Sequence, residues 1–396
     1  MKAKSLKIRE ILATNSQKTI EIELETGKGR VRSSVPMGTS KSKYEIKYFQ
    51  TPEAIRKFLL LRRTFTNQEY ADQSDLDNAL RILDKTPDFK EIGGNVALAI
   101  STVFLKAFAL ENNQEIYEYL ASIAKKKISI PKPISNVVGG WKQSGSGDIQ
   151  EYLLLPVHQN SFFESIEKIS VAYRTIGQRL KDNDPTFAFA KNIEGGWVTN
   201  LNIEEILQII SKTAVENLLK VGLDVAASHL WDGHANYVYT FSNKILNRHE
   251  QKDFLEKLAK RYPIAYIEDP FNEDDFVTHS VLNLELQPRI ICGDDLYSTN
   301  SARIKDGADF KATSAVIIKP SQVGTVTDVI SAIETAKKNK MLTVFSHRSG
   351  ETEDTLICHL AVGLSGDYIK IGISGDRTVK INEMIRIEEN IFGNKY

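Results

Sequence analysis

The sequence is poor in cysteine and has no excess of either charge. Only Cys292 and Cys358 occur in 396 residues, and both lie in apolar runs. We therefore expect two buried free thiols and no disulfide framework. The 51 lysines and arginines equal the 51 aspartates and glutamates in number, so the formal net charge is zero. No global basic field exists that would bind nucleic acid or an anionic membrane.

Long hydrophobic runs are also absent. No window approaches eighteen consecutive apolar residues, and the N-terminal segment MKAKSLKIRE is basic without an apolar stretch behind it. We therefore expect neither a transmembrane helix nor a secretory signal, and we expect a cytoplasmic protein. The apolar share of 41% and the charged share of 26% are typical of a soluble globular protein.

The first third of the chain changes from strand patterns to helix patterns. Residues 19–25 (TIEIELE) alternate apolar and polar side chains, and a further strand (RVRSSV) is expected after the turn at residues 26–29. Three helical patterns follow: AIRKFLLLRRTF, LDNALRILDK and NVALAISTVFLKAFALENN. Strands followed by a block of helices favour an α+β domain over residues 1–130, which ends in the proline-containing junction KKKISIPKPISN.

The remaining residues, 131–396, alternate short apolar strands with helices and give an α/β pattern. Six strand patterns, 23 to 44 positions apart, end in ionisable residues, namely Asp224, Glu268, Asp294, Lys319, His347 and Lys370. This repetition predicts a parallel (β/α)8 barrel, whose active site lies at the C-terminal strand ends. One such charge could simply mark where a strand leaves the core, but six in succession favour a site.

Three of these strand ends carry carboxylates, at Asp224, Glu268 and Asp294. A ligand set made only of oxygen, with no clustered histidine or cysteine, suits a hard cation, and Mg²⁺ is the natural choice. The alternative is that each carboxylate pairs with a lysine across the barrel.

Two lysines, Lys319 and Lys370, are expected to face the same cavity. A lysine near another cation and a metal has its charged form disfavoured, so it can act as a base at neutral pH. A Schiff-base role is the alternative. Arg348 and Ser349 follow the next strand end and suit a phosphate or carboxylate group.

The histidines show no spacing typical of a zinc site. His229 and His234 flank a WDG turn, so we interpret them as surface residues, with a zinc site as the lesser alternative. His347 differs because it belongs to the polar stretch that follows a strand, and we expect it to be a donor in the active site.

Several motifs resemble one family, the enolases, which are the phosphopyruvate hydratases of glycolysis. The motifs are SHRSGETEDT (residues 346–355), YIEDPFNEDDF (266–276), GDDLYSTN (293–300), VIIKPSQVGTVTD (316–328) and RIEEN (386–390). The resemblance runs from the N-terminal strands to the C-terminus and is strongest after Leu223. It implies an N-terminal α+β domain before an enolase-type barrel, in a homodimer or larger homo-oligomer. The implied reaction is Mg²⁺-dependent dehydration of 2-phosphoglycerate, a phosphorylated carboxylate, to phosphoenolpyruvate.

The resemblance also implies a role for each matching residue of the reaction. Lys319 matches the base that removes the proton α to the carboxylate, and Lys370 would stabilise the dianionic intermediate together with the metals. Glu194 matches the acid that helps the hydroxyl group leave, and Glu151 matches its partner carboxylate. His347 would lie beside them.

Metal and substrate ligands are implied in the same way. The first Mg²⁺ would be held by Asp224, Glu268 and Asp294, and the second by Ser40 together with the substrate phosphate. The residues implied for substrate binding are Arg348, Ser349, Lys142 and Ser40.

The chain departs from the family pattern near the implied site. Lys142 stands where the family has a loop histidine, Ile193 replaces the aspartate before the acid, and the segment after Lys370 is shorter. Residues 13–18 (ATNSQK) replace an Asp-Ser-Arg-Gly-Asn-Pro stretch. Two alternatives therefore remain open: a paralogue that uses the same half-reaction on a different carboxylate, and a non-catalytic protein that kept the barrel.

Overall fold

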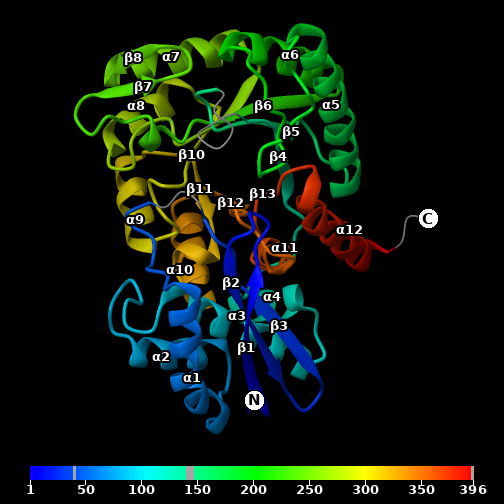
Figure 1. Cartoon of the computed structure of the whole chain (residues 1–396), viewed down its shortest axis with the longest axis vertical. Helices are drawn as coiled ribbons and strands as arrows, with labels where there is room; N and C mark the ends of the chain where they lie inside the picture. Colours follow the sequence, from blue (N-terminus) through cyan, green and yellow to red (C-terminus); the bar gives the residue numbers. More distant parts are fainter. Residues whose placement is uncertain (39–41, 140–146, 394–396) are drawn as a thin grey trace.

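The structure is a computed structural model that describes residues 1–38, 42–139 and 147–393. The N-terminal strands and helices, blue to cyan in Figure 1, gather at one end of the molecule, and a barrel with its surrounding helices forms the rest. The expected order, an α+β part followed by a barrel, is confirmed.

The N-terminal part consists of a three-stranded antiparallel sheet and four helices. Its elements are β1 (Ser5–Leu12), β2 (Lys18–Glu25), β3 (Arg30–Ser34), α1 (Thr51–Asn67), α2 (Gln73–Leu83), α3 (Gly94–Glu111) and α4 (Ile116–Ala124). The alternating segment at residues 19–25 is β2, which lies between β1 and β3.

Helix α3 is long, apolar and almost entirely buried, and it packs against β2 and β3. By length and mean hydropathy α3 could cross a membrane, although polar residues interrupt its apolar sequence. However, 83% of its 18-residue window is buried within the protein, as in the core helix of a globular domain.

Eight strands close the barrel. In order around it they are β4 (Lys132–Val138), β5 (Glu151–Pro156), β6 (Leu219–Asp224), β9 (Ile264–Glu268), β10 (Ile290–Gly293), β11 (Ala315–Ile318), β12 (Leu342–Ser346) and β13 (Tyr368–Lys370). Each of the six strands expected from the sequence is present. The prediction that all strands run parallel is wrong for β5, which is antiparallel to both β4 and β6. Only residues 139–150 separate β4 from β5, which is the lower limit of length for a crossover that returns the chain for a parallel strand.

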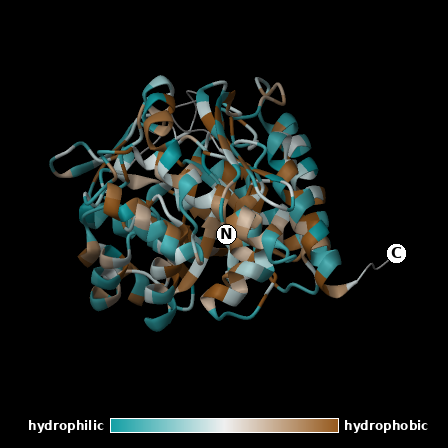
Figure 2. Ribbon diagram, turned by 90° about the horizontal axis from the view of Figure 1, so that it is seen from below, coloured by the Kyte–Doolittle hydropathy of each residue, from teal (hydrophilic) through white to brown (hydrophobic). Residues whose placement is uncertain are grey.

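Helices cover the outside of the barrel. They are α5 (Phe162–Asn183), α6 (Ile203–Glu216), α7 (Arg248–Arg261), α8 (Phe276–Glu285), α9 (Ser301–Phe310), α10 (Val326–Lys338), α11 (Leu356–Gly363) and α12 (Thr378–Phe392). A hairpin and three short 3₁₀ helices complete the fold: β7 (Asn236–Tyr239), β8 (Lys244–Asn247), η1 (Ala227–His229), η2 (Pro320–Gln322) and η3 (Gly375–Arg377). Hydrophobic residues gather toward the middle of the molecule, while the outer helices mix hydrophilic and hydrophobic residues (Figure 2).

Both cysteines are buried and free, as expected. Cys292 belongs to a small apolar cluster contributed by the barrel strands, and Cys358 belongs to the larger core that extends through the helices and the N-terminal part.

The polar stretch after β12 joins the barrel to the N-terminal part. Asp354 accepts hydrogen bonds from Lys106 Nζ at 2.7 Å and from the Ser34 amide at 3.0 Å. Gly350 and Met37 exchange backbone hydrogen bonds at 2.6 and 2.8 Å. This part of the stretch therefore holds the two parts of the chain together rather than facing a ligand.

His279 of α8 makes the stability of this fold dependent on pH. Its ring is fully buried, and its Nδ1 lies 2.7 Å from the Asp275 carbonyl. Burial lowers the pKa of His279 to about 4 from its usual 6.5, so the unfolded chain binds the extra proton between these values. The free energy of unfolding should fall by up to about 3 kcal/mol as the pH drops across this window, and the contribution is fully present above it.

The variant His279→Gln should lack this contribution. The difference in free energy of unfolding between the wild type and this variant, measured with urea from about pH 7 to pH 4, should shrink as the pH falls. A constant difference at every pH would contradict the assignment to His279.

Candidate functional site

A polar pocket lies at the C-terminal ends of the barrel strands. Nine of the residues singled out from the sequence line it: Glu151, Glu194, Asp224, Asp294, Lys319, His347, Arg348, Ser349 and Lys370. Glu268 is fully buried beside them and contacts Lys370. The ends of strands that are far apart in the sequence therefore supply one site.

The ammonium group of Lys370 lies at the centre of one side of the pocket. Its Nζ is 2.8 Å from Glu151 Oε2, 3.0 Å from Asp224 Oδ2 and 2.7 Å from Glu268 Oε1. Burial disfavours the charged amine, but the three carboxylates outweigh it and raise the pKa of Lys370 well above its usual value. Lys370 is therefore a permanent cation in this arrangement.

Lys319 lies on another side of the pocket and forms an ion pair with Asp294. Gln322 Nε2 donates to the second oxygen of Asp294 at 3.0 Å. Burial, together with Arg348 and Lys370, opposes the charged amine, yet Asp294 raises the pKa of Lys319 overall. The expectation that a second cation and a metal together disfavour the charged form of these lysines stays a prediction. Among the protein's own side chains, carboxylates lie closer to both lysines than the other cations do, and they raise both pKa values.

The three carboxylates expected to bind a metal are thus paired with lysines, which was the alternative to metal binding. Asp224 and Glu268 pair with Lys370, and Asp294 pairs with Lys319. Burial and the neighbouring Asp224 raise the pKa of Glu268 to about 8. The carboxylates therefore repel one another even with a lysine between them.

The pocket as a whole has an excess of acidic groups. Its lining includes seven carboxylates against three lysines and arginines, and the buried Glu268 adds one more. Two groups of described residues bring ligand atoms within 4.8 Å of one another, Glu151 with Glu194 and His347, and Asp269 with Asp294 and Asp295. Oxygen donors in such excess fit a hard divalent cation.

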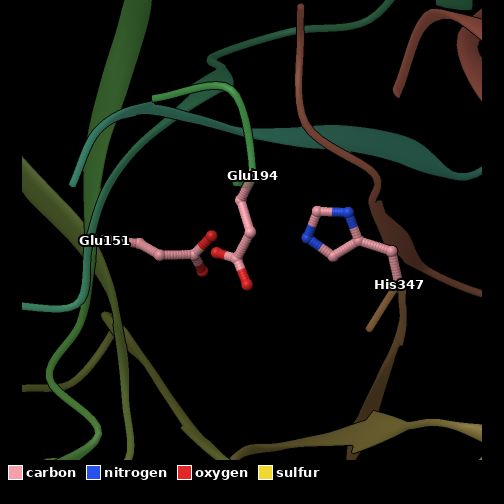
Figure 3. A group of neighbouring side chains, drawn as sticks. All are labelled: Glu151, Glu194 and His347. Atoms are coloured by element: carbon pink, nitrogen blue, oxygen red, sulfur yellow. The ribbon is translucent and has the colours of Figure 1, made fainter. Parts of the chain in front are cut away.

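Glu151, Glu194 and His347 face one another across the pocket (Figure 3). Glu151 comes from β5, Glu194 from the connection between α5 and α6, and His347 directly follows β12. Burial and the nearby carboxylates outweigh Lys370 and raise the pKa of Glu151 well above its usual value. Burial and the surrounding cations, first Arg377, lower the pKa of His347 well below its usual value. The group therefore combines a carboxyl whose protonated form is favoured by its surroundings with an imidazole whose neutral form is favoured.

Arg348 supplies a buried cation that the N-terminal part holds in place. Its guanidinium donates to Glu45 Oε2 at 2.9 Å, and its amide donates to Glu351 Oε1 at 2.7 Å. Gly38 passes so close that an added Cβ would lie 1.8 Å from Arg348 Nη2. The carbonyl of the next residue, Ser349, accepts a hydrogen bond from Arg377 at 2.7 Å.

Two expected site residues, Ser40 and Lys142, lie outside the described residues. Their roles stay predictions.

Sequence reasoning missed several residues that line the pocket. Asp269 and Asp295 directly follow two of the expected strand ends, and their adjacency was the signal that could have identified them. The surface interpretation is wrong for His229, because η1 folds over the end of β6 and brings its ring into the lining, 3.9 Å from Asp295 Oδ2. Such a fold-back depends on tertiary contacts that no local pattern reports.

Comparison with known proteins gives one family over nearly the whole chain. The model described as "Enolase, N-terminal domain" matches residues 3–120, and "Enolase, C-terminal TIM barrel domain" matches residues 127–396. Similar curated proteins, each named Enolase, come from Methanosphaera stadtmanae (35% identity, 98% of this chain and 96% of the relative), Archaeoglobus fulgidus (36%, 96% of each) and Natronomonas pharaonis (36%, 97% and 98%).

The ion cluster around Lys370 gives a stability prediction. Lys370→Met leaves Glu151, Asp224 and Glu268 buried without their cation, which should lower the free energy of unfolding by about 3–5 kcal/mol. The loss should be largest at alkaline pH and smaller at acidic pH, where the carboxylates take up protons. Urea unfolding in the presence of a chelator measures it, with the exposed Lys305→Met as the control. Equal stabilities of the two variants would contradict the cluster's role.

Proposed function

The chain belongs to the enolase family and is an enolase-like hydro-lyase, and from this premise we propose that it dehydrates 2-phosphoglycerate to phosphoenolpyruvate with Mg²⁺. One observation supports this proposal above all. A single pocket contains a lysine paired with a carboxylate, a separate acid–imidazole group and a buried arginine. Removal of an α-proton, protonation of a departing hydroxyl and binding of a phosphate need groups of these three kinds.

Family membership implies a metal cofactor, and the acidic residues of the pocket fit one. We propose that Asp224, Glu268 and Asp294 hold the first Mg²⁺ and that Ser40 contributes to a second. When bound, Mg²⁺ supplies positive charge that polarises the substrate carboxylate and offsets the repulsion among the acidic side chains.

Lys319 is the proposed base. Its Nζ has to be neutral before it can accept the α-proton, so its ion pair with Asp294 has to loosen when the site is loaded. Lys370 keeps its proton, because three carboxylates surround it, and its charge would balance the negative charge that develops on the substrate.

The hydroxyl group would leave on the opposite side of the pocket. Glu194 is the proposed acid, and the raised pKa of Glu151 keeps a proton within the same group. The neutral His347 imidazole offers both a donor and an acceptor at this position.

Arg348 is proposed to bind the phosphate, together with Ser349 and, from outside the described residues, Lys142. The charge of Arg348 is already paired with Glu45 of the N-terminal part, which orients the guanidinium before substrate arrives. A preoriented cation loses less conformational entropy when an anion binds.

Other features are also proposed. The family implies a role in glycolysis and a homodimer or larger homo-oligomer, and the sequence patterns favour a cytoplasmic location and a boundary between domains 1–130 and 131–396.

The proposed base predicts the outcome of one substitution. Wild-type enzyme with Mg²⁺ should convert 2-phosphoglycerate to phosphoenolpyruvate, followed by ultraviolet absorbance. Lys319→Ala should slow exchange of the α-proton in deuterated solvent by about 10² to 10⁴. The exposed Lys305→Ala serves as the control and should leave exchange unchanged. If the wild type exchanges the α-proton of another carboxylate but not that of 2-phosphoglycerate, the paralogue is favoured. If Lys319→Ala exchanges the α-proton as fast as the wild type, Lys319 is not the base.

In Glu194→Gln, removal of the α-proton should continue while loss of the hydroxyl group is slowed. This variant lacks the acid for the hydroxyl group but keeps Lys319, so we expect α-proton exchange to continue while formation of phosphoenolpyruvate falls by about 10² to 10⁴. Nuclear magnetic resonance of the α-proton and absorbance of the product measure both in one sample. The exposed Glu334→Gln, outside the pocket, is the matched control. Equal losses of exchange and product formation would contradict separate roles for the two residues.

A further inference from the structure

Asp269, which follows β9, has an unusual backbone conformation. Its φ is +42°, in the left-handed region that few residues other than glycine and asparagine or aspartate adopt. Its amide donates to the Cys292 carbonyl at 3.0 Å, and its carbonyl accepts from the Ala227 amide at 3.0 Å. Asp269 thus links the ends of the three strands that carry the proposed metal ligands.

The side chain of Asp269 accepts two backbone hydrogen bonds from the next strand end. Its Oδ1 accepts from the Asp294 amide at 2.9 Å, and its Oδ2 accepts from the Asp295 amide at 2.7 Å. Two bonds from consecutive amides to one carboxylate fix the backbone from which the Asp294 side chain extends. That side chain then reaches Lys319 and Gln322.

A carboxylate at this place is electrostatically costly. Asp269 is buried, with 3% of its surface exposed, and lies next to Glu268 and within 4.8 Å of ligand atoms of Asp294 and Asp295. Within residues 1–38, 42–139 and 147–393, no lysine or arginine forms an ion pair with it. The two amide bonds offset this cost, and each oxygen of the side chain accepts one of them.

We propose that Asp269 is a positioning residue: by accepting the amides of Asp294 and Asp295, it holds the Asp294 carboxylate in the orientation that metal binding requires. This inference rests on the proposed function, in which Asp294 is a Mg²⁺ ligand. Groups that orient metal ligands through hydrogen bonds typically change metal affinity by about 10- to 100-fold when they are replaced.

The variant Asp269→Asn tests the inference. Asparagine tolerates the left-handed conformation and keeps one acceptor oxygen but loses the second. The Kd for Mg²⁺, measured by calorimetry without substrate, should rise by about 10- to 100-fold. Saturating Mg²⁺ should restore kcat, with the KM for substrate unchanged, which a general loss of structure would not allow.

Asp84 provides a matched control. It is also fully buried, and its Oδ2 accepts two consecutive amides, from Glu91 at 2.8 Å and from Ile92 at 3.0 Å, but it lies in the N-terminal part. Asp84→Asn should lower the melting temperature and leave the Kd for Mg²⁺ unchanged. Equal weakening of Mg²⁺ binding in both variants would assign the effect to stability and overturn the inference.

The outcomes separate this inference from the proposed function. If the wild type binds Mg²⁺ and Asp269→Asn binds it equally well, the positioning role is overturned and the proposed function is untouched. If the wild type binds no Mg²⁺, the proposed function fails and the inference fails with it. If Asp269→Asn does not fold, amide hydrogen exchange in the wild type tests the positioning role instead. The Asp294 and Asp295 amides donate to Asp269, so both should exchange slowly. Exchange as fast as in exposed loops would overturn the role.

Discussion

The site depends first on one buried cation, the ammonium group of Lys370. It contacts Glu151 of β5, Asp224 of β6 and Glu268 of β9, and so joins the last strand of the barrel to three others. Buried carboxylates at such short range repel one another strongly, and only a cation between them makes the arrangement tolerable. The strand ends can therefore converge because a positive charge lies among them.

This cluster leaves the rest of the pocket free for chemistry. Lys370 pairs with three carboxylates, whereas among the described residues Lys319 forms an ion pair with Asp294 alone, a pair that a bound cation can loosen. Glu151, which also contacts Lys370, faces Glu194 and His347; burial and nearby carboxylates raise the pKa of Glu151, and burial and nearby cations lower the pKa of His347. The N-terminal part completes the site, because Glu45 orients Arg348. The proposed role of Arg348 thus depends on the packing of the two parts of the chain against each other.

The sequence predicted the site better than it predicted the connections around it. Strand ends such as Asp224 and Lys319 could be identified because buried strands are short apolar runs and the C-terminal ends of barrel strands share one face. The reversed direction of β5 could not be identified, since a strand pattern has no direction and depends on the connection before it. The fold-back of His229 and the left-handed conformation of Asp269 likewise depend on contacts between separate strand ends.

Electrostatics was the other limit of the sequence. Lys319 and Lys370 line one pocket, as expected. The direction of their pKa shifts depends on which charged groups lie closest, and the sequence does not give these distances. For Lys370 the neighbouring carboxylates lie within 3.0 Å, which decides the sign. The family pattern implies roles for these residues, whereas the geometry gives the direction in which each pKa is shifted.

The central claim is that a divalent ion is held among Asp224, Glu268 and Asp294 at the mouth of the barrel. Anomalous X-ray scattering from crystals grown with Mn²⁺ in place of Mg²⁺ would locate the ion directly. The account predicts one strong peak within coordination distance of all three carboxylates. A peak elsewhere, such as between Glu194 and His347, or no peak at saturating Mn²⁺, would contradict it.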